Sequence, residues 1–166
     1  YGIYLLREAS ARTNDELTGL GERLSVPILW GHCHDLGFKP QRLDALELMC
    51  TDDQYGAARL DVHASQDRFS HAGFDDGDLF LMEGFIGSAP DGTPTTLGRG
   101  GSDLSAAYAA CCLDAAVREK WTDLAGMMTA DPRVVPSARV IDELSYAEAM
   151  ELCHFGAKVV FPPTVA

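Results

Sequence analysis

The chain has 166 residues, of which 46% are hydrophobic and 23% are charged, a composition typical of a globular domain with a sizeable core. Its formal net charge is −12 at pH 7, so its surface should repel nucleic acids and anionic lipids, and no apolar run reaches the roughly 18 residues of a membrane span. We therefore expect no nucleic-acid partner and no membrane partner, and we expect any anionic ligand to be held by a few well-placed cations.

The five cysteines indicate a reducing environment. Their number is odd, and Cys111 and Cys112 are adjacent, which does not fit a disulfide framework, so we predict free thiols and a cytoplasmic location. The first residues show no signal peptide. Because the first residue is Tyr1 rather than Met, we expect the chain to be a fragment whose N-terminus lies upstream.

The first predicted element is a long helix. Residues 13–16 have the spacing of a capping box, with a hydroxyl at the cap and a carboxylate three residues later, and a helical pattern of apolar residues follows as far as Leu29. Pro27 is expected to bend or interrupt this helix, and Gly37 is expected to end it.

Short strands are predicted next. Residues 45–49, 58–62 and 79–82 have the composition of strands, whereas residues 65–78 are polar and predict a loop or a poor helix. Residues 88–94 are rich in Gly and Pro and predict a turn.

A second helix is predicted after this turn. Ser102 is expected to open it, and residues 104–116 form its body. Residues 117–121 are predicted to form a strand, and residues 122–136 a long functional loop.

The last predicted elements are a helix and a strand. Residues 145–148 form a second capping box, and the helix that it opens should end near Gly156. A final strand is predicted at residues 158–161. The alternation of strands and helices along one uninterrupted domain predicts an α/β fold with a largely parallel sheet.

The most distinctive segment is residues 95–103, Thr-Thr-Leu-Gly-Arg-Gly-Gly-Ser-Asp. The paired glycines let backbone N–H groups approach a ligand, and they lead into a helix N-terminus, where free N–H groups and the helix dipole favour an anion. Arg99 adds a planar guanidinium suited to a carboxylate or a phosphate. Asp103 could orient a cation or be a simple charge in the first helical turn. The alternative is an ordinary glycine-rich turn capped by Ser102.

A second candidate binding segment is residues 121–133, which follow a predicted strand at the position where open α/β sheets place ligand loops. Arg133 could meet a phosphate, and Asp123 could hydrogen bond a ribose or a base. The alternative is a surface loop shaped by its turn residues.

Two further charged residues carry weaker signals. Lys158 follows the last predicted helix, where it could reach a phosphate or interact with the last helical carbonyls. Glu22 could bind the ammonium group of an amino acid or be an exposed helix charge.

A metal site is not expected. His32, Cys33 and His34 supply too few ligands for tetrahedral zinc, and the other histidines are scattered. Cys153 and His154 are interpreted as packing residues, because no orienting third group accompanies them.

Taken in this order, the segments resemble those of aspartate kinases of the amino acid kinase superfamily. The similarity runs from about Leu6 to Val165, and the pieces Thr-Thr-Leu-Gly-Arg-Gly-Gly-Ser-Asp and Met-Thr-Ala-Asp-Pro-Arg are specific as an ordered pair. Glutamate 5-kinases and uridylate kinases share the fold, but their loops differ. The stretches that carry the resemblance are 21–25, 84–103, 121–139 and 141–159.

The resemblance implies a site for L-aspartate. Glu22 would bind its ammonium group, and Asp103 would orient the catalytic machinery. The carboxylates would be held by Arg99, Gly100, Gly101 and Ser102.

The resemblance also implies a nucleotide site for ATP. Lys158 would lie near the phosphates, and with Asp103 and Arg99 it would form the catalytic group. Mg²⁺ would be held mainly by the phosphates rather than by protein ligands. The residues lining the nucleotide site would be Thr122, Asp123, Met128 and Arg133.

The family fold is a three-layer αβα sandwich around a mostly parallel sheet, and its members commonly form homodimers. They begin with a strand and a Lys-Phe-Gly-Gly loop and continue into regulatory domains, and neither feature occurs in this sequence. Residues 1–166 are therefore interpreted as a partial, N-terminally incomplete catalytic domain. The chain departs from the family pattern at Pro27, Ala125 and Phe161.

The implied reaction moves the terminal phosphoryl group of ATP to the side-chain carboxylate of L-aspartate, the first step towards lysine, threonine and methionine. A carboxylate is already ionised at neutral pH, so the acceptor needs no general base, and the site needs cations and backbone N–H groups instead. Two alternatives stay open. One is a non-catalytic relative that binds a ligand or partner subunits, and the other is a different small-molecule kinase of the same fold.

Overall fold

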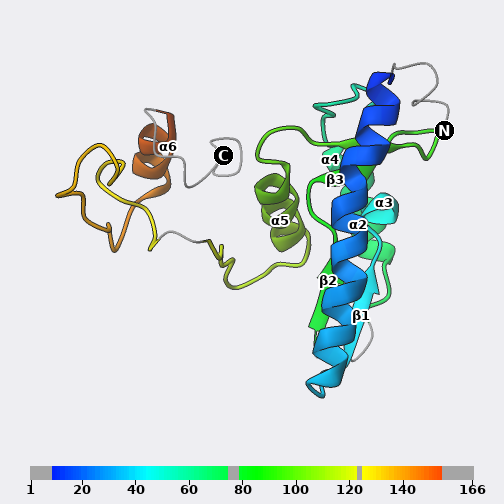
Figure 1. The fold of residues 1–166 in the computed structure, drawn as a ribbon. Helices are drawn as coiled ribbons and strands as arrows, with labels where there is room; N and C mark the ends of the chain where they lie inside the picture. The colour runs from blue at the N-terminus through cyan, green and yellow to red at the C-terminus, as the bar shows by residue number, and fades with distance from the viewer. Residues whose placement is uncertain (1–8, 75–78, 123–124, 155–166) are drawn as a thin grey trace. The chain divides into compact units, whose positions relative to one another are not determined.

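The computed structural model describes residues 9–74, 79–122 and 125–154. The chain divides into two compact units, residues 1–114 and residues 115–166, and Figure 1 labels most of their helices and strands. Asp123, Lys158 and the strand predicted at 158–161 lie outside the described residues.

The first unit begins with one long helix, α2 (Ala11–Asp35). Ser10 caps it by accepting a hydrogen bond from an N–H of the first turn, so the helix begins earlier than the predicted capping box. The predicted interruption at Pro27 is wrong. Arg23 and Pro27 are both exposed, so water can hydrogen bond the Arg23 carbonyl that the proline leaves without a donor. The helix ends just before Gly37, as predicted.

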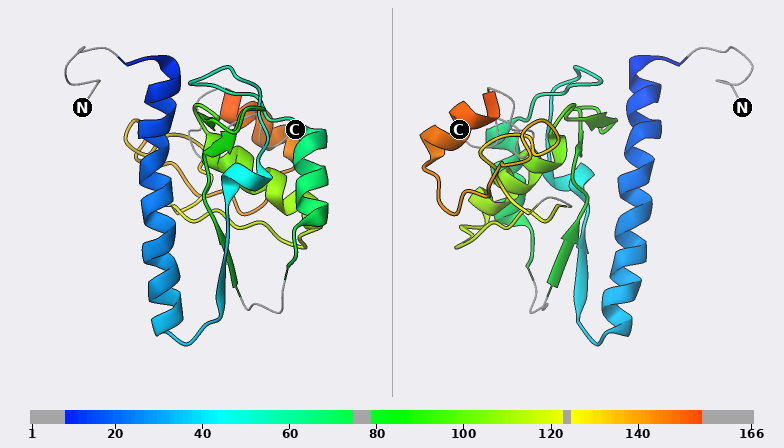
Figure 2. Two further views of the ribbon diagram at one scale, coloured as in Figure 1. Left: turned by 90° about the vertical axis from the view of Figure 1, so that its right-hand side faces the viewer. Right: turned by 60° about the vertical axis from the view of Figure 1, so that its left-hand side comes forward.

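Strands β1 (Pro40–Leu43) and β2 (Leu79–Met82) pair in parallel, with Pro40 opposite Leu79. Strand β2 confirms the predicted strand at 79–82, whereas β1 was not predicted. The connection between them contains the helices α3 (Ala45–Leu48) and α4 (Val62–His71). In both views of Figure 2, α2 and α4 lie on opposite sides of the β1–β2 pair.

The strand predicted at 45–49 is wrong, because these residues begin with helix α3. Asp44 caps this helix by accepting a hydrogen bond from the N–H of Leu46 at 2.9 Å. An apolar-rich run of this length fits either structure, and the cap at Asp44 favours the helix.

The strand predicted at 58–62 is wrong. The only β-structure of this segment is an isolated bridge between Thr51 and Leu60. Of the two alternatives given for residues 65–78, a loop or a poor helix, the structure shows a helix as far as His71, where α4 ends. Asp61 caps α4 by accepting from the N–H of Ala64 at 3.0 Å. The sequence gives only a weak helical pattern here because one of the two buried residues of α4 is polar, namely Ser65 beside Phe69.

Strands β3 (Ile86–Ser88) and β4 (Pro94–Thr96) form an antiparallel hairpin, and the predicted turn at 88–94 contains its loop. Helix α2 packs on β4, and helix α5 (Gly101–Cys112) packs on β3. A β-carbon on Gly19 of α2 would lie 3.0 Å from Cγ2 of Ile86, so this small residue lets the helix lie close to the hairpin.

The buried apolar core of the first unit is formed by residues of α3, α4 and β3 and of the loops that follow α3 and β4. Tyr108 of α5 joins α4 by donating a hydrogen bond to the carbonyl of Val62. The core residues are Ala45, Leu48, Met49, Phe69, Ile86 and Leu97.

The second unit contains helix α6 (Tyr146–His154), and its predicted capping box is confirmed. The carboxylate of Glu148 accepts hydrogen bonds from the N–H and the hydroxyl of Ser145, at 2.8 and 2.6 Å. The strand predicted at 117–121 is wrong, because these residues have no regular structure. The predicted end near Gly156 lies outside the described residues.

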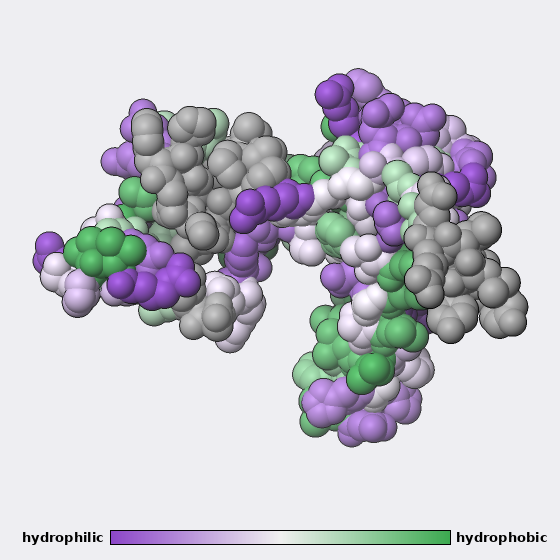
Figure 3. Space-filling view, turned by 45° about the horizontal axis from the view of Figure 1, so that its top comes forward, coloured by the Kyte–Doolittle hydropathy of each residue, from purple (hydrophilic) through white to green (hydrophobic). Residues whose placement is uncertain are grey.

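The strands of the described residues form two small sheets, one parallel and one antiparallel, and the helices α3 and α4 lie between β1 and β2 in the chain. The predicted α/β class is confirmed. Large apolar side chains are exposed along α2 and its following loop, and Figure 3 shows hydrophobic surface on this part of the first unit. No helix in the described part of the chain is long and apolar enough to cross a bilayer.

Candidate functional site

The glycine-rich turn, residues 97–101, runs from the end of β4 into helix α5. Gly100 is the N-cap of α5 and has a φ of 75°, in the left-handed region that glycine adopts without a steric cost. The helix begins at Gly101 and has no side-chain cap, so the prediction that Ser102 caps it is wrong. It also ends at Cys112, before the predicted body of 104–116 is complete. The N–H of Gly101 donates to the Gly98 carbonyl at 3.0 Å, but no side chain caps the helix start, which leaves the N–H of Ser102 able to bind an anion.

The turn packs tightly against Phe85. A β-carbon on Gly101 would lie 2.8 Å from Cβ of Leu97 and 2.9 Å from Cδ2 of Phe85, so only glycine fits without a shift. Phe85 itself has a φ of 71°, which costs a bulky residue free energy, and strain of this kind gathers at functional sites. The N–H of Leu97 donates to the Phe85 carbonyl at 2.9 Å.

A buried hydroxyl supports this contact from within α5. Ser105 is fully buried, accepts a hydrogen bond from the N–H of Phe85 at 3.2 Å and donates one to the carbonyl of Ser102 at 3.1 Å. The segment at Phe85 and the first turn of α5 are thus joined by both packing and hydrogen bonds.

Asp15 lies at the other end of the turn and was not predicted as part of the site. Its side chain is buried and accepts from the N–H and the hydroxyl of Thr96, at 2.8 and 2.9 Å, and from the N–H of Gly56 at 2.9 Å. The only local signal is its spacing on α2, where Asp15, Gly19 and Val26 lie on one buried face.

Glu22 and Arg99 are the two predicted substrate-binding charges of the first unit. Glu22 is half-buried on α2, and Arg99 is exposed in the turn. Within the described residues, neither side chain has an ion pair or a hydrogen bond to another residue. Each charge is therefore available to a ligand.

Asp103 lies in the first turn of α5, two residues after the helix begins. An acidic side chain at this position interacts favourably with the positive end of the helix dipole. The structure thus places Asp103 beside the glycine-rich turn, as the sequence predicted.

Thr122, Met128 and Arg133 belong to the second unit. Met128 forms an antiparallel bridge with Val140, which the sequence did not predict. The predicted loop at 122–136 otherwise has no helix or strand in its described residues.

The guanidinium of Arg133 is held by Asp131. Its Nε and Nη2 atoms donate to the two carboxylate oxygens at 3.0 and 2.7 Å, and this ion pair raises the pKa of Arg133. A phosphate bound by Arg133 would have to share it with this carboxylate.

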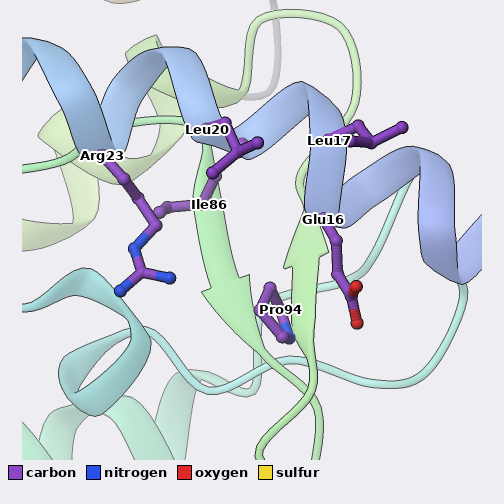
Figure 4. Close-up of a pocket in the computed structure, with 7 residues that line it drawn as sticks. Glu16, Leu17, Leu20, Arg23, Ile86 and Pro94 are labelled. Carbon is purple, nitrogen blue, oxygen red and sulfur yellow. The ribbon is translucent and has the colours of Figure 1, made fainter. Parts of the chain in front are cut away.

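A shallow apolar groove lies between α2 and the β3–β4 hairpin, and Figure 4 shows Leu17, Leu20, Ile86 and Pro94 along it. It contains neither Glu22 nor the glycine-rich turn. In the part of the chain that the structure describes, no group of three or more His, Cys, Asp or Glu side chains could hold a metal ion.

Residues 5–166 match the family model for the amino acid kinase family. The chain belongs to this family. This amino acid kinase is 38% identical over 165 residues to the bifunctional aspartokinase/homoserine dehydrogenase of Buchnera aphidicola, covering 99% of the chain and 20% of that protein. It is 39% identical over 171 residues to lysine-sensitive aspartokinase 3 of Escherichia coli K12, covering 98% of the chain and 38% of that protein.

The fold of this amino acid kinase is also that of solved aspartokinases. The crystal structure of E. coli aspartokinase III in complex with aspartate and ADP superposes with a TM-score of 0.89 at 39% identity, covering 95% of this chain and 36% of that chain. Aspartate kinase from Synechocystis superposes with a TM-score of 0.74 at 30% identity, covering 99% of this chain and 27% of that chain. The chain therefore spans less than two fifths of the length of each of these relatives.

Proposed function

We propose that this amino acid kinase takes part in the ATP-dependent phosphorylation of the side-chain carboxylate of L-aspartate, which gives 4-phospho-L-aspartate. The observation that carries the proposal is a pair of opposite charges in the first unit, on Arg99 and Glu22, neither of which has an ion-pair partner among the described residues. Together they match a ligand that has both carboxylates and an ammonium group. The identity of 38–39% to two aspartokinases supports this choice.

In the proposed site, Glu22 binds the ammonium group of aspartate. Arg99 and the backbone N–H groups of the helix start, over Gly100, Gly101 and Ser102, hold the carboxylates. Asp103 orients the groups that surround the transferring phosphoryl.

In the reaction, a carboxylate oxygen of aspartate forms a bond to the terminal phosphorus of ATP, while the bond from that phosphorus to the oxygen bridging to ADP breaks. The acceptor is already ionised, so the protein must position it and neutralise spreading negative charge rather than remove a proton. A donor set of a guanidinium and helix N–H groups suits this task.

The nucleotide site is proposed for the C-terminal part of the chain, with ATP as the phosphoryl donor. The crystal of the E. coli relative with ADP supports a nucleotide ligand. Lys158 would lie near the phosphates, and Mg²⁺ would be held mainly by phosphate oxygens. The proposed lining residues are Thr122, Asp123, Met128 and Arg133.

We further propose that residues 1–166 are part of a catalytic domain with a three-layer αβα sandwich around a mostly parallel sheet. We propose a cytoplasmic homodimer as the working form. The acidic net charge of −12 favours small-molecule substrates over nucleic acid or a membrane as partners.

The test is a trapping assay on the full-length protein. With MgATP, L-aspartate and hydroxylamine, the acyl phosphate should be captured as aspartyl hydroxamate. A hydroxamate signal with glutamate and none with aspartate would assign a different amino-acid kinase. No signal with either acceptor, from a protein that binds aspartate and ATP, would assign a non-catalytic relative.

A further inference from the structure

We propose that Asp15 is a positioning residue, whose buried carboxylate holds the glycine-rich turn in the conformation that receives the amino-acid substrate. This inference rests on the function proposed above. Asp15 does not contact the proposed ligand groups; it acts through Thr96 and Gly56.

The carboxylate of Asp15 accepts three hydrogen bonds from residues on two separate segments. Its Oδ2 accepts from the N–H of Gly56 and from the N–H of Thr96, at 2.9 and 2.8 Å. Its Oδ1 accepts from the hydroxyl of Thr96 at 2.9 Å. Because only 3% of Asp15 is exposed, water could not easily accept these hydrogen bonds if the carboxylate were removed.

Both partners of Asp15 border the turn. Thr96 is the last residue of β4 and directly precedes it. The carbonyl oxygen of Gly56 lies 3.2 Å from the position that a β-carbon on Gly98 would occupy, so the segment at Gly56 forms a wall beside the turn. The carboxylate of Asp15 therefore holds both the residue that precedes the turn, Thr96, and the segment at Gly56 that packs against the turn.

The same carboxylate also fixes the helix that carries Glu22. Glu22 follows Asp15 by seven positions, which places the two side chains on one face of α2 about 10 Å apart along its axis. Because Asp15 bonds α2 to the residue preceding the turn, it sets Glu22 and Arg99 relative to each other. Loss of this link should weaken recognition of the amino acid more than recognition of ATP.

The kinetic test compares three variants of the full-length protein. Asp15→Ala removes all three acceptor bonds. Asp15→Asn can still make three hydrogen bonds, because the amide oxygen can accept from both N–H groups and the amide nitrogen can donate to the Thr96 hydroxyl, which reverses the direction of that one bond. Ser65→Ala is the matched control, since it removes another buried side chain that joins a helix to a loop, through Cys50, away from the turn.

We expect Asp15→Ala to raise the KM for aspartate at least tenfold and to change the KM for ATP less than twofold. Asp15→Asn should stay within threefold of the wild type for aspartate, and Ser65→Ala should lower the Tm without changing that KM. An aspartate KM for Asp15→Ala that matches Ser65→Ala would overturn the proposal.

Amide hydrogen exchange tests the positioning without relying on catalysis. The N–H of Gly101 bonds to the Gly98 carbonyl at 3.0 Å and does not contact Asp15. Its exchange should be at least tenfold faster in Asp15→Ala and unchanged in Asp15→Asn and Ser65→Ala. Unchanged exchange in Asp15→Ala would overturn the proposal even in an active enzyme. Faster exchange in a protein that does not phosphorylate aspartate would support the positioning role and reject the proposed function alone.

Discussion

Gly101 and Phe85 are packed so closely that a β-carbon on the glycine would lie 2.9 Å from Cδ2 of the aromatic ring. The contact joins the first residue of α5 to a residue with a φ of 71° at the start of the β3–β4 hairpin. The ring and the glycine therefore fix where the N–H groups of the helix start point, and with them the proposed binding site for the substrate carboxylates.

Gly101→Ala is expected to disrupt this contact. The added methyl group also meets Cβ of Leu97, and overpacking of a buried site costs about 1–3 kcal/mol. We expect a lower free energy of unfolding and a higher KM for aspartate. The control is Gly31→Ala, where no atom lies within 4 Å of the new β-carbon, and this change should stabilise α2 by about 0.5–1 kcal/mol. A Gly101→Ala protein with wild-type stability and kinetics would show that the contact is unimportant.

Asp15→Ala should destabilise the first unit more than Thr96→Val. The first change leaves two buried donors of Thr96 unsatisfied, at about 1–3 kcal/mol each, whereas the second removes one hydroxyl and leaves the carboxylate its two N–H donors. Urea unfolding of the two variants measures the difference. If the free energy of unfolding fell equally in Asp15→Ala and Thr96→Val, the hydrogen bond from the Thr96 hydroxyl alone would account for the stabilisation by Asp15.

Glu22→Gln tests the proposed recognition of the ammonium group. The neutral amide keeps the shape of the side chain but loses its charge, so aspartate should bind about tenfold more weakly or worse. Succinate has the two carboxylates without the ammonium group, and its inhibition constant should be the same for both proteins. If the change weakened succinate and aspartate equally, Glu22 would not be the ammonium ligand.

The capping box of α6 predicts a pH dependence. The hydrogen bonds from Ser145 hold the pKa of Glu148 below its ordinary value of 4.5. Since the folded pKa is lowered, the cap stabilises α6 above about pH 4.5 and this contribution is lost as the pH falls through the folded value. Carbon-13 NMR titration should show the lowered pKa, and Ser145→Ala should raise it. The same pKa in both proteins would contradict the role of the cap.

Local features of the structure could be predicted from the sequence when all their partners lie within one turn. The capping box at Ser145 and Glu148 is such a case, because both residues and the helix start fall within four positions. The pair of Arg133 and Asp131 is equally local, although the sequence analysis assigned the arginine to a phosphate instead. The glycine-rich turn could be predicted because glycine adopts a positive φ without a steric cost, as Gly100 does, so paired glycines in a sequence indicate a turn.

The errors arise where tertiary contacts decide the structure. Helix α4 could be given only as an alternative to a loop, because Ser65 is buried on its inner face, where its hydroxyl is satisfied by the backbone of Cys50. The role of Asp15 could not be predicted, because its partners Gly56 and Thr96 lie 41 and 81 positions away. Within the sequence, Asp15 lay inside a predicted capping box formed by Thr13 and Glu16 and had no role of its own, and only the packing of α2 against β4 brings it to the turn.

The most direct test of the central claim is calorimetric titration of L-aspartate into the full-length protein and its Arg99→Ala variant. The guanidinium of Arg99 has no partner in the described part of the chain, so its removal should leave the fold intact, as judged by circular dichroism. Loss of a charged contact to a carboxylate should weaken binding about 10- to 100-fold. Arg12→Ala removes another exposed arginine, whose ion pairs with Glu16 and Asp91 lie at the surface, and it should bind aspartate normally. Wild-type affinity in Arg99→Ala would contradict the account.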